Sequence, residues 1–382
     1  MSTSYIVNGQ VYLDGHFQEA IVAMEDEKLH LLPPDAPVSG EVYDAAGKTV
    51  VPGFIDIHTH GAVGVDVNGA APEDLDKIAQ FFAGNGTTSW LCSVLTDTEA
   101  QTRWCIDQCK AYQSQEGGGA ELLGIHLEGP FLASAYKGAM PEHLLRKGEP
   151  ALLRSYQEQA EGCIRYLTAS PEVEGVLDLI PAARELGIVT AIGHSGADYE
   201  TAMAAIATGA AAATHTFNAM QLLHQHRPAI LGAVLESDVY CEAICDGRHL
   251  HPGIVRLLLK TKGLNRIVAI TDSIMAAGLP DGNYHLGVNE VVVEEGDAKL
   301  ASDGTRAGST LTQNTALKNL LAWTERPLEE LLPLLTENPA HLIGVWDRKG
   351  SIADGKDADL TVLDGHLNVE AVFLRGRRFQ GT

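Results

Sequence analysis

Basic residues are scarce in this chain of 382 residues, which has 27 Lys+Arg against 50 Asp+Glu and a formal net charge of −23 at pH 7. Because proteins bind nucleic-acid phosphates with concentrated lysine and arginine, this balance argues against a nucleic-acid partner. The hydrophobic fraction of 45% and the charged fraction of 20% are those of an ordinary globular protein.

Cysteine is also sparse, and long apolar runs are lacking. Six cysteines are too few for a disulfide scaffold, and the pairs Cys105/Cys109 and Cys241/Cys245 do not have the Cys-x-x-Cys spacing of zinc or redox sites. Every apolar stretch is interrupted well before the roughly 20 residues of a membrane helix, and the start MSTSYIVNGQ lacks the basic and apolar regions of a secretion signal. We therefore expect a cytoplasmic protein with free thiols and no membrane partner.

Motifs for nucleotide binding and for nucleophilic catalysis are missing as well. The chain has no GxxxxGK[ST] phosphate loop, no GxGxxG opening a helix after a strand and no Gly-x-Ser-x-Gly elbow. No cysteine lies in a setting that would activate its thiol. These absences make nucleotide-dependent and serine or cysteine chemistry poor interpretations.

The chain instead alternates short apolar runs with longer helical patterns, between two β-rich ends. Helical patterns cover, for example, residues 72–84, 172–187 and 198–209. The eight apolar runs are GFIDIH (53–58), TTSWLCS (87–93), ELLGIHLEG (121–129), CIRYLTAS (163–170), IVTAIGHS (188–195), AAATHTFN (211–218), YCEAICDG (240–247) and RIVAITDS (266–273). Eight strands with outer helices predict an α/β fold, a (β/α)8 TIM-like barrel over residues 53–344. Residues 1–52 and 345–382 are expected to form one small β domain.

Polar residues stand at the C-terminal ends of these runs, where a barrel gathers side chains at one mouth. A doubly wound sheet would not bring together side chains from so many strands. The residues in question are His58, His60, His126, Glu128, His194, His215, Asp246 and Asp272.

His58 and His60 are two residues apart at a strand end, so both point to one face and can bind one ion or bridge two. The alternative to metal binding is that His58 and His60 are ordinary polar residues at a strand end. Glu128 in HLEGP is a candidate carboxylate ligand or a loop cap, and His194 or His215 alone would be read as a core histidine. Taken together, the last three supply nitrogen and oxygen ligands and leave a position for water, as in catalytic divalent sites.

Asp272, in AITDSIMAAG, closes the eighth predicted strand. Beside a metal it would accept a proton from the attacking water and pass it to the leaving group. Its alternative role is the N-cap of a following helix.

These motifs resemble the amidohydrolase superfamily and, within it, the N-acetylglucosamine-6-phosphate deacetylases. PGFID and GKDADL are typical of the superfamily, whereas HLEGP, GHS, THxxNAM and DGxH are typical of the deacetylases. The resemblance implies a barrel with a small β-sandwich formed by both termini. It also implies hydrolysis of the acetamide of N-acetylglucosamine 6-phosphate, an amino-sugar phosphate, to glucosamine 6-phosphate and acetate.

The same resemblance implies that Glu128, His194 and His215 bind the main metal and that Asp272 is the catalytic acid/base. Some relatives have lost the His-x-His pair, but this chain keeps His58 and His60, which allows one or two ions. Zinc is the metal that we expect, and Fe, Mn or Co are alternatives that suit the same ligands. The resemblance also points to a homodimer in which a basic residue reaches the neighbour's phosphate site.

The resemblance places Asn218, Ala219, His249 and the backbone of Arg306 to Gly308 near the sugar phosphate. The charges of Arg248 and Arg306 also suit a phosphate, since arginine binds phosphate through two hydrogen bonds. The full set of predicted substrate-binding residues is Ala139, Met140, Asn218, Ala219, His226, Arg227, Arg248, His249, Arg306, Ala307 and Gly308.

Two segments depart from the family pattern. Met140 stands where relatives usually have His or Gln, and His143 could replace that side chain only if the loop were rearranged. HQHRPA replaces the usual HHREPG, so His226 occupies the arginine position and Arg227 comes one step later. We expect phosphate binding to persist with a rearranged set of partners.

Three alternatives stay open at this point. N-acetylgalactosamine-6-phosphate deacetylases share nearly every motif. A cyclic-amide amidohydrolase would carry a metal-bridging lysine on the fourth strand, which CIRYLTASPE lacks. An inactive barrel kept as a scaffold predicts eroded ligands, whereas all the ligand positions are intact.

Overall fold

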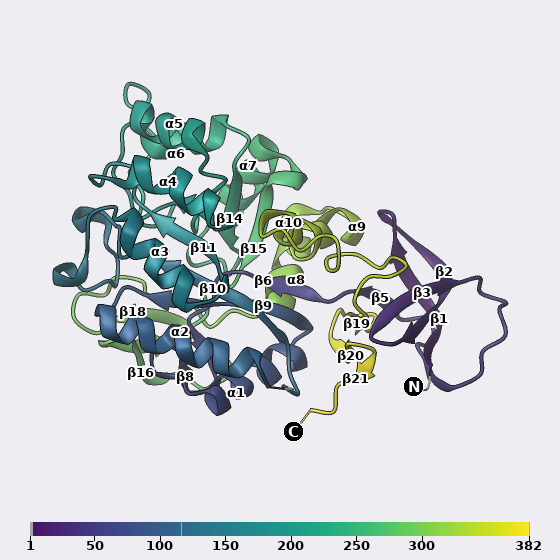
Figure 1. The fold of residues 1–382 in the computed structure, drawn as a ribbon. Coiled ribbons are helices and arrows are strands. Elements are labelled where there is room, and N and C mark those ends of the chain that lie inside the picture. The colour runs from purple at the N-terminus through teal and green to yellow at the C-terminus, as the bar shows by residue number, and fades with distance from the viewer. Residues whose placement is uncertain (1–2, 116, 382) are drawn as a thin grey trace.

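Eight parallel strands form the barrel at the centre of the computed structural model, which describes residues 3–115 and 117–381 (Figure 1). Each strand pairs with its neighbour in the chain, and the barrel closes where Thr59 and Ser273 form a parallel bridge. The strands are β6 (Phe54–Asp56), β9 (Thr87–Leu95), β10 (Glu121–Glu128), β11 (Ile164–Ala169), β12 (Val189–Ile192), β13 (Ala212–Ala213), β14 (Tyr240–Ile244) and β15 (Ile267–Ile270). Seven of them lie within the predicted apolar runs, β9 extends two residues past its run, and the predicted α/β barrel is confirmed.

Helices surround the barrel and follow most of its strands (Figure 1). The α-helices are α1 (Pro72–Gly84), α2 (Glu99–Gln113), α3 (Pro150–Gln159), α4 (Val176–Glu185), α5 (Tyr199–Thr208), α6 (Ala229–Glu236), α7 (Pro252–Lys262), α8 (Gln313–Thr324), α9 (Leu328–Leu331) and α10 (Glu337–Leu342). Short 3-10 turns are η1 (Val67–Gly69), η2 (Ser134–Tyr136), η3 (Glu142–Leu144), η4 (Leu264–Arg266) and η5 (Leu332–Leu334).

Local sequence signals explain where these helices begin. Helix α5 starts after Asp198, whose carboxylate accepts the Thr201 N–H at 2.8 Å. Helix α4 begins at Val176, later than the predicted 172, because Gly175 has a φ of +85°. A residue in that left-handed conformation cannot continue a right-handed helix.

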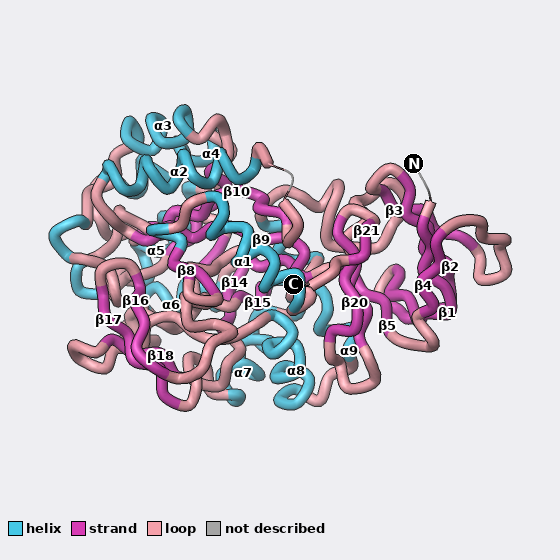
Figure 2. Tube along the Cα trace, turned by 90° about the horizontal axis from the view of Figure 1, so that it is seen from below, coloured by secondary structure: helices cyan, strands magenta, loops and turns pink. Residues whose placement is uncertain are grey.

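Both ends of the chain form a second sheet beside the barrel, and Figures 1 and 2 both show it apart from the barrel strands. Its strands are β1 (Ser4–Leu13), β2 (His16–Glu25), β3 (Lys28–Leu32), β4 (Glu41–Asp44), β5 (Thr49–Pro52), β19 (Leu360–Leu363), β20 (Val369–Leu374) and β21 (Arg377–Arg378).

The two chain ends meet where Pro52 of β5 pairs with Leu360 of β19. Val22 of β2 shares one hydrophobic core with Leu360 of β19 and Phe373 of β20, although β5 and β1 separate β2 from β19 in the sheet order, so the sheet folds back on itself as a small sandwich. The predicted limits of this domain at residues 52 and 345 stay a prediction, and its outermost positions 1, 2 and 382 lie outside the described residues.

Two insertions that the sequence did not reveal lie near the mouth of the barrel. One is the three-stranded sheet β16 (Gly282–Leu286), β17 (Asn289–Glu294) and β18 (Asp297–Leu300), and the other is the pair β7 (Gly61–Ala62) and β8 (Val65–Asp66). Leu286 packs in one cluster with Leu95 and Met140, so the larger insertion forms one wall beside the mouth.

No helix within residues 3–115 and 117–381 is both long and apolar enough to span a membrane.

Candidate active site

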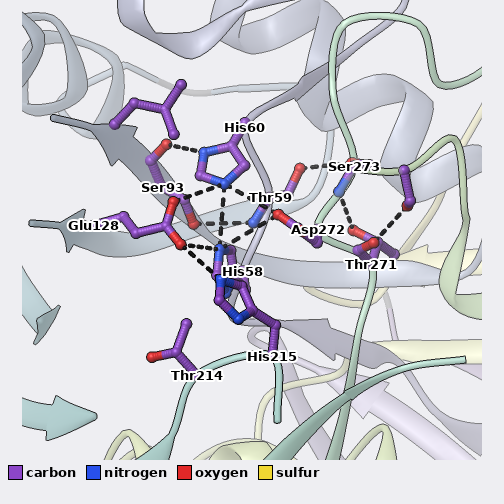
Figure 3. Close-up of polar contacts among 12 residues, drawn as sticks. His58, Thr59, His60, Ser93, Glu128, Thr214, His215, Thr271, Asp272 and Ser273 are labelled. Atoms are coloured by element: carbon purple, nitrogen blue, oxygen red, sulfur yellow. Dashed lines mark hydrogen bonds and ion pairs between the residues drawn. The ribbon is translucent and has the colours of Figure 1, made fainter. Parts of the chain in front are cut away.

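Five predicted residues converge at the C-terminal ends of the barrel strands. Figure 3 shows His58, His60, Glu128, His215 and Asp272 pointing toward one another. All of them are buried, the most exposed being Asp272 at 7%. Together with His194, which is also buried, they form two groups, His58/His60/Asp272 and Glu128/His194/His215, and within each group the possible ligand atoms lie within 4.8 Å of one another.

Glu128 joins the two groups. Its Oε1 lies 3.1 Å from Nε2 of His194 and 3.2 Å from Nε2 of His215. Its Oε2 lies 3.3 Å from Nε2 of His60. Asp272 completes the other group, with Oδ1 3.1 Å from Nε2 of His60 and 3.5 Å from Nε2 of His58.

The backbone turns sharply at three of these strand ends. His194, His215 and Asp272 have φ values of +47°, +28° and +50°, in a region that residues other than glycine rarely adopt. Backbone hydrogen bonds stabilise the turn at Asp272, since its N–H donates to the His58 carbonyl at 2.9 Å. Strained backbone of this kind concentrates at functional sites, where it fixes the direction of a side chain.

Hydrogen bonds fix which nitrogen of each ring faces the centre. Nδ1 of His60 donates to the Ser93 carbonyl at 2.8 Å, and Nδ1 of His194 donates to the Tyr136 carbonyl at 2.8 Å. A carbonyl can only accept, so these Nδ1 atoms carry protons and, in the neutral rings, the Nε2 atoms carry lone pairs.

The same applies to His58, whose Nδ1 lies 2.9 Å from the Glu242 carboxylate. The Nε2 atoms of His58 and His60 therefore face each other as two acceptors only 3.2 Å apart. Two lone pairs at that distance repel unless a positive charge lies between them. Imidazole nitrogen and carboxylate oxygen are ligands of divalent transition metals, so the residues present fit such an ion.

The charges of the site support the same conclusion. Burial alone raises the pKa of Asp272, but the charge of His58 and the hydrogen bond from His60 outweigh it and lower the pKa to about 2. Burial alone lowers the pKa of His60, but hydrogen bonds to Asp272 and Glu128 outweigh it and raise the pKa to about 9. Asp272 and Glu128 thus attract positive charge, which protons on the histidine rings supply in the absence of an ion and which a divalent ion would supply to the neutral rings.

His126 and Asp246, the other polar strand-end residues, do not join the two groups. His126 uses both ring nitrogens, contacting Ser93 Oγ and Thr168 Oγ1 at 2.9 Å each. Asp246 pairs with Nδ1 of His249 at 2.7 Å. His126 is therefore a satisfied core residue, and Asp246 orients a pocket residue.

A cavity of about 470 Å³ opens above the ligand groups. His60, Glu128, His194, His215 and Asp272 lie at its base, and His58 is buried below. The predicted substrate residues that line it are Ala139, Met140, Asn218, Ala219, His249, Arg306, Ala307 and Gly308.

His226, Arg227 and Arg248 do not line this cavity. The first two are exposed and line a separate hollow of about 700 Å³ formed around residues 221–229. Arg248 donates to the Glu295 carbonyl. Arg306 does reach the cavity, but Asp297 accepts two hydrogen bonds from its guanidinium, at 2.8 and 2.9 Å.

The loop that carries Met140 provides an apolar wall. Met140 is 2% exposed and packs with Leu95 and Leu286, so it offers no hydrogen bond of the kind that His or Gln would. His143 is exposed and does not line the cavity.

Sequence reasoning missed several residues of the site. Lys137 lines the cavity beside Met140, and Leu95 and Leu286 form its apolar side. Lys137 stands in KGAM, two residues before Ala139, so its charge and its closeness to predicted site residues were a usable signal. Glu242, in contrast, had no signal beyond being an acid within an apolar run.

Comparisons with known proteins identify the family of this chain. A model of the amidohydrolase family matches residues 49–379, and the chain belongs to that family. The chain is 35% identical over 347 residues to the N-acetylglucosamine-6-phosphate deacetylase of Bacillus subtilis, covering 90% of this chain and 87% of that protein. It is also 35% identical over 343 residues to the N-acetylgalactosamine-6-phosphate deacetylase of Escherichia coli, covering 89% and 90%.

A solved structure of a deacetylase also matches nearly the whole chain. A mutant of the N-acetyl-D-glucosamine-6-phosphate deacetylase of Mycobacterium smegmatis, in complex with N-acetyl-D-glucosamine-6-phosphate, matches with a TM-score of 0.93 at 30% identity. The match covers 99% of this chain and 100% of that chain. The resemblance inferred from the sequence motifs is confirmed.

Proposed function

We propose that this chain hydrolyses the acetamide group of N-acetylglucosamine 6-phosphate, giving glucosamine 6-phosphate and acetate. The observation that carries the proposal is the Glu128/His194/His215 group beside Asp272, at the base of a cavity of about 470 Å³. The relatives that match this chain over most of their length are named as deacetylases of amino-sugar phosphates.

A divalent ion, held by Glu128, His194 and His215, would lower the pKa of water and polarise the acetyl carbonyl. Asp272 is ionised at neutral pH because its pKa is about 2, so its carboxylate can accept a proton from the attacking water. It then delivers that proton to the departing nitrogen, because an amine leaves poorly as its anion. His58 and His60 are positioned to hold a second ion with Asp272.

Asn218, Ala219, His249 and Arg306 are proposed to bind the sugar phosphate. His249 presents Nε2 toward the cavity, since Asp246 holds its Nδ1. Because Asp297 already pairs with Arg306, Lys137 is a further candidate for the positive charge that a phosphate requires. Such local charge lets an acidic protein bind an anion.

A homodimer would bring further positive charge to the phosphate. His226 and Arg227 lie outside their own cavity, beside Leu222 and Leu223, which are 62% and 52% exposed. Exposed leucines of this size favour a protein contact. We propose that the segment 221–229 faces the phosphate end of the partner's cavity.

Zinc is the proposed ion, since histidine and glutamate ligation suits it well, although Fe, Mn and Co accept the same ligands. A cytoplasmic location agrees with six free cysteines, of which five are buried. The N-acetylgalactosamine epimer is the second candidate substrate, favoured by the Escherichia coli relative at 35% identity.

The test measures acetate release from the 6-phosphates of both N-acetylated sugars and from their unphosphorylated forms, with zinc, iron, manganese and cobalt quantified on the same sample. We expect the highest kcat/KM with N-acetylglucosamine 6-phosphate and at least one ion per chain. A higher kcat/KM for the other epimer would reassign the substrate. Equal kcat/KM with and without phosphate would contradict the phosphate site, and no acetate from any sugar would overturn the proposed function.

A further inference from the structure

Glu242 is a buried acid that the proposed reaction does not use. It lies on β14, the seventh strand of the barrel in chain order, and its side chain is 0% exposed. Its Oε2 contacts Nδ1 of His58 at 2.9 Å and also accepts the backbone N–H of His215 at 2.9 Å. One carboxylate oxygen thus contacts one member of each ligand group.

The contact with His58 sets the state of that ring. Because Oε2 also accepts the His215 N–H, it acts as an acceptor, and Nδ1 of His58 is the donor. Nε2 then keeps its lone pair and faces Nε2 of His60 and Oδ1 of Asp272. A ring whose Nδ1–H is held by a carboxylate is a better metal ligand, since the negative charge raises its basicity.

Glu242 contacts the two ligand groups in different ways. His60 and His194 are oriented by the neutral carbonyls of Ser93 and Tyr136, whereas His58 is oriented by a charged carboxylate. The ring of His215 has no partner at Nδ1 among the described residues.

His215 is instead held through its backbone. Its φ is +28°, and the hydrogen bond from its N–H to the Glu242 carboxylate stabilises this turn. The Glu242 carbonyl also accepts the N–H of Thr216 at 2.9 Å, so main chain and side chain of Glu242 hold consecutive residues.

We propose that Glu242 is a positioning residue that couples the two ion sites, orienting His58 through its ring and His215 through its backbone. Carboxylates that orient ligands in this way commonly change metal affinity by about 10–100-fold when they are removed. This inference rests on the metal-dependent function proposed above.

The first experiment measures zinc stoichiometry and dissociation constants, by competition with a chelator, for the wild type, Glu242→Gln and Glu242→Ala. The Gln side chain keeps an acceptor for both donors but loses the charge, so we expect only the ion at His58 to bind about 10-fold more weakly. Ala removes both contacts, and we expect both ions to bind at least about 10-fold more weakly. Glu121→Gln, which removes a carboxylate from the other end of the barrel, is the control and should keep wild-type affinities.

The second experiment isolates the link to His215. In His58→Ala the ion bound by the Glu128 group is the one left to measure, and Glu242 can act on it only through the His215 N–H. Adding Glu242→Ala to that variant should weaken this ion by a further factor of about 10. If the double variant binds zinc as tightly as His58→Ala, Glu242 does not couple the two sites.

Three outcomes separate this inference from the proposed function. A wild type that binds no zinc or other divalent ion overturns the proposed function itself. A wild type that binds zinc while both Glu242 variants bind it equally well overturns the role of Glu242 alone. If Glu242→Ala does not fold, Glu242→Gln still decides, because a purely structural role would lower stability without selectively weakening the ion at His58.

Discussion

Strand β10 carries a glutamate at each end, and the two glutamates lie in opposite electrostatic settings. Glu121 opens the strand beside Asp357 and Asp359, and the three carboxylates lie within 4.8 Å of one another. Lys349, only 2% exposed at its side chain, places Nζ 2.5 Å from Glu121 and 3.1 Å from Asp357, and it also contacts Asp359. Arg348 adds ion pairs of 2.6 Å to Glu121 and Asp357.

Glu128 closes the same strand, and its surroundings lack such cations. Within the described residues the ion pairs of Glu128 and Asp272 are all with histidines, and neither pairs with lysine or arginine. Where the chain supplies its own ammonium, a carboxylate cluster is a structural joint between barrel and sheet. Where it supplies only imidazoles, which can give up their protons and bind a metal, the cluster can take an ion from solution, and that difference separates the functional cluster from the structural one.

The strongest test of this contrast is Glu128→Gln. Losing the carboxylate shared by both ligand groups should remove the bound ions and lower kcat/KM by about 1,000-fold or more, since a Lewis acid supplies several kcal/mol. Metal content and acetate release measure both effects. Glu121→Gln, seven residues earlier on the same strand, should keep its metal and its kcat, and a comparable loss of activity there would break the contrast.

Asp272→Asn tests whether catalysis and metal binding can be separated in the upper cluster, which comprises the groups His58/His60/Asp272 and Glu128/His194/His215. Without a carboxylate to accept and return the proton, kcat should fall by about 100–10,000-fold. The ion at Glu128, His194 and His215 should remain, because Asp272 belongs to the other group. The measurement is kcat together with metal content, and an unchanged kcat would exclude Asp272 as the acid/base.

Lys349→Met should make the lower cluster, formed by the carboxylates of Glu121, Asp357 and Asp359, more like the upper cluster, since it removes the ammonium that neutralises them. Removing the ammonium leaves buried carboxylates with incomplete neutralisation, and we expect a loss of about 3–5 kcal/mol in the free energy of unfolding. Oxygen ligands prefer hard cations, so calcium should then raise the Tm of the zinc-loaded variant. The wild type should show no calcium effect, and an equal Tm response in both proteins would contradict this account.

The ligand residues could be found in the sequence because a parallel barrel brings the ends of all its strands to one mouth. A histidine or acid that ends an apolar run, such as His194 or Asp272, therefore needs no further information to be placed there. Glu242 could not be found in this way. It lies inside the run YCEAICDG and contacts His58, 184 residues away in the chain, which no local pattern encodes.

The lower cluster and the phosphate end of the cavity could not be predicted from the sequence, for related reasons. Glu121 and Arg348 are 227 residues apart, and their contact depends on how the terminal sheet packs on the barrel. The cavity wall at Leu286 belongs to an insertion after the eighth strand, and Arg227 belongs to an exposed segment outside its own cavity. Periodicity predicts strands and helices, but it does not predict where loops of this kind lie.

Acid unfolding gives the smallest of the expected effects and isolates the lower cluster. Burial alone raises the pKa of Glu121, but the hydrogen bond from Arg348 and the charge of Lys349 outweigh it and lower the pKa from 4.5 to about 2. A carboxyl whose pKa is lower in the folded state stabilises the protein fully above its unfolded pKa, and that stabilisation disappears as the pH falls through the folded pKa.

Glu121→Gln should therefore cost about 1.5–3 kcal/mol of unfolding free energy at pH 7, and the difference from the wild type should shrink between pH 4.5 and 2. Urea unfolding of the metal-free proteins measures this, with Glu161→Gln as the control, because its exposed pair with Lys110 should add no measurable stability at any pH. A difference for Glu121→Gln that stays constant over this range would mean that its charge does not matter and that only its packing holds the barrel to the sheet.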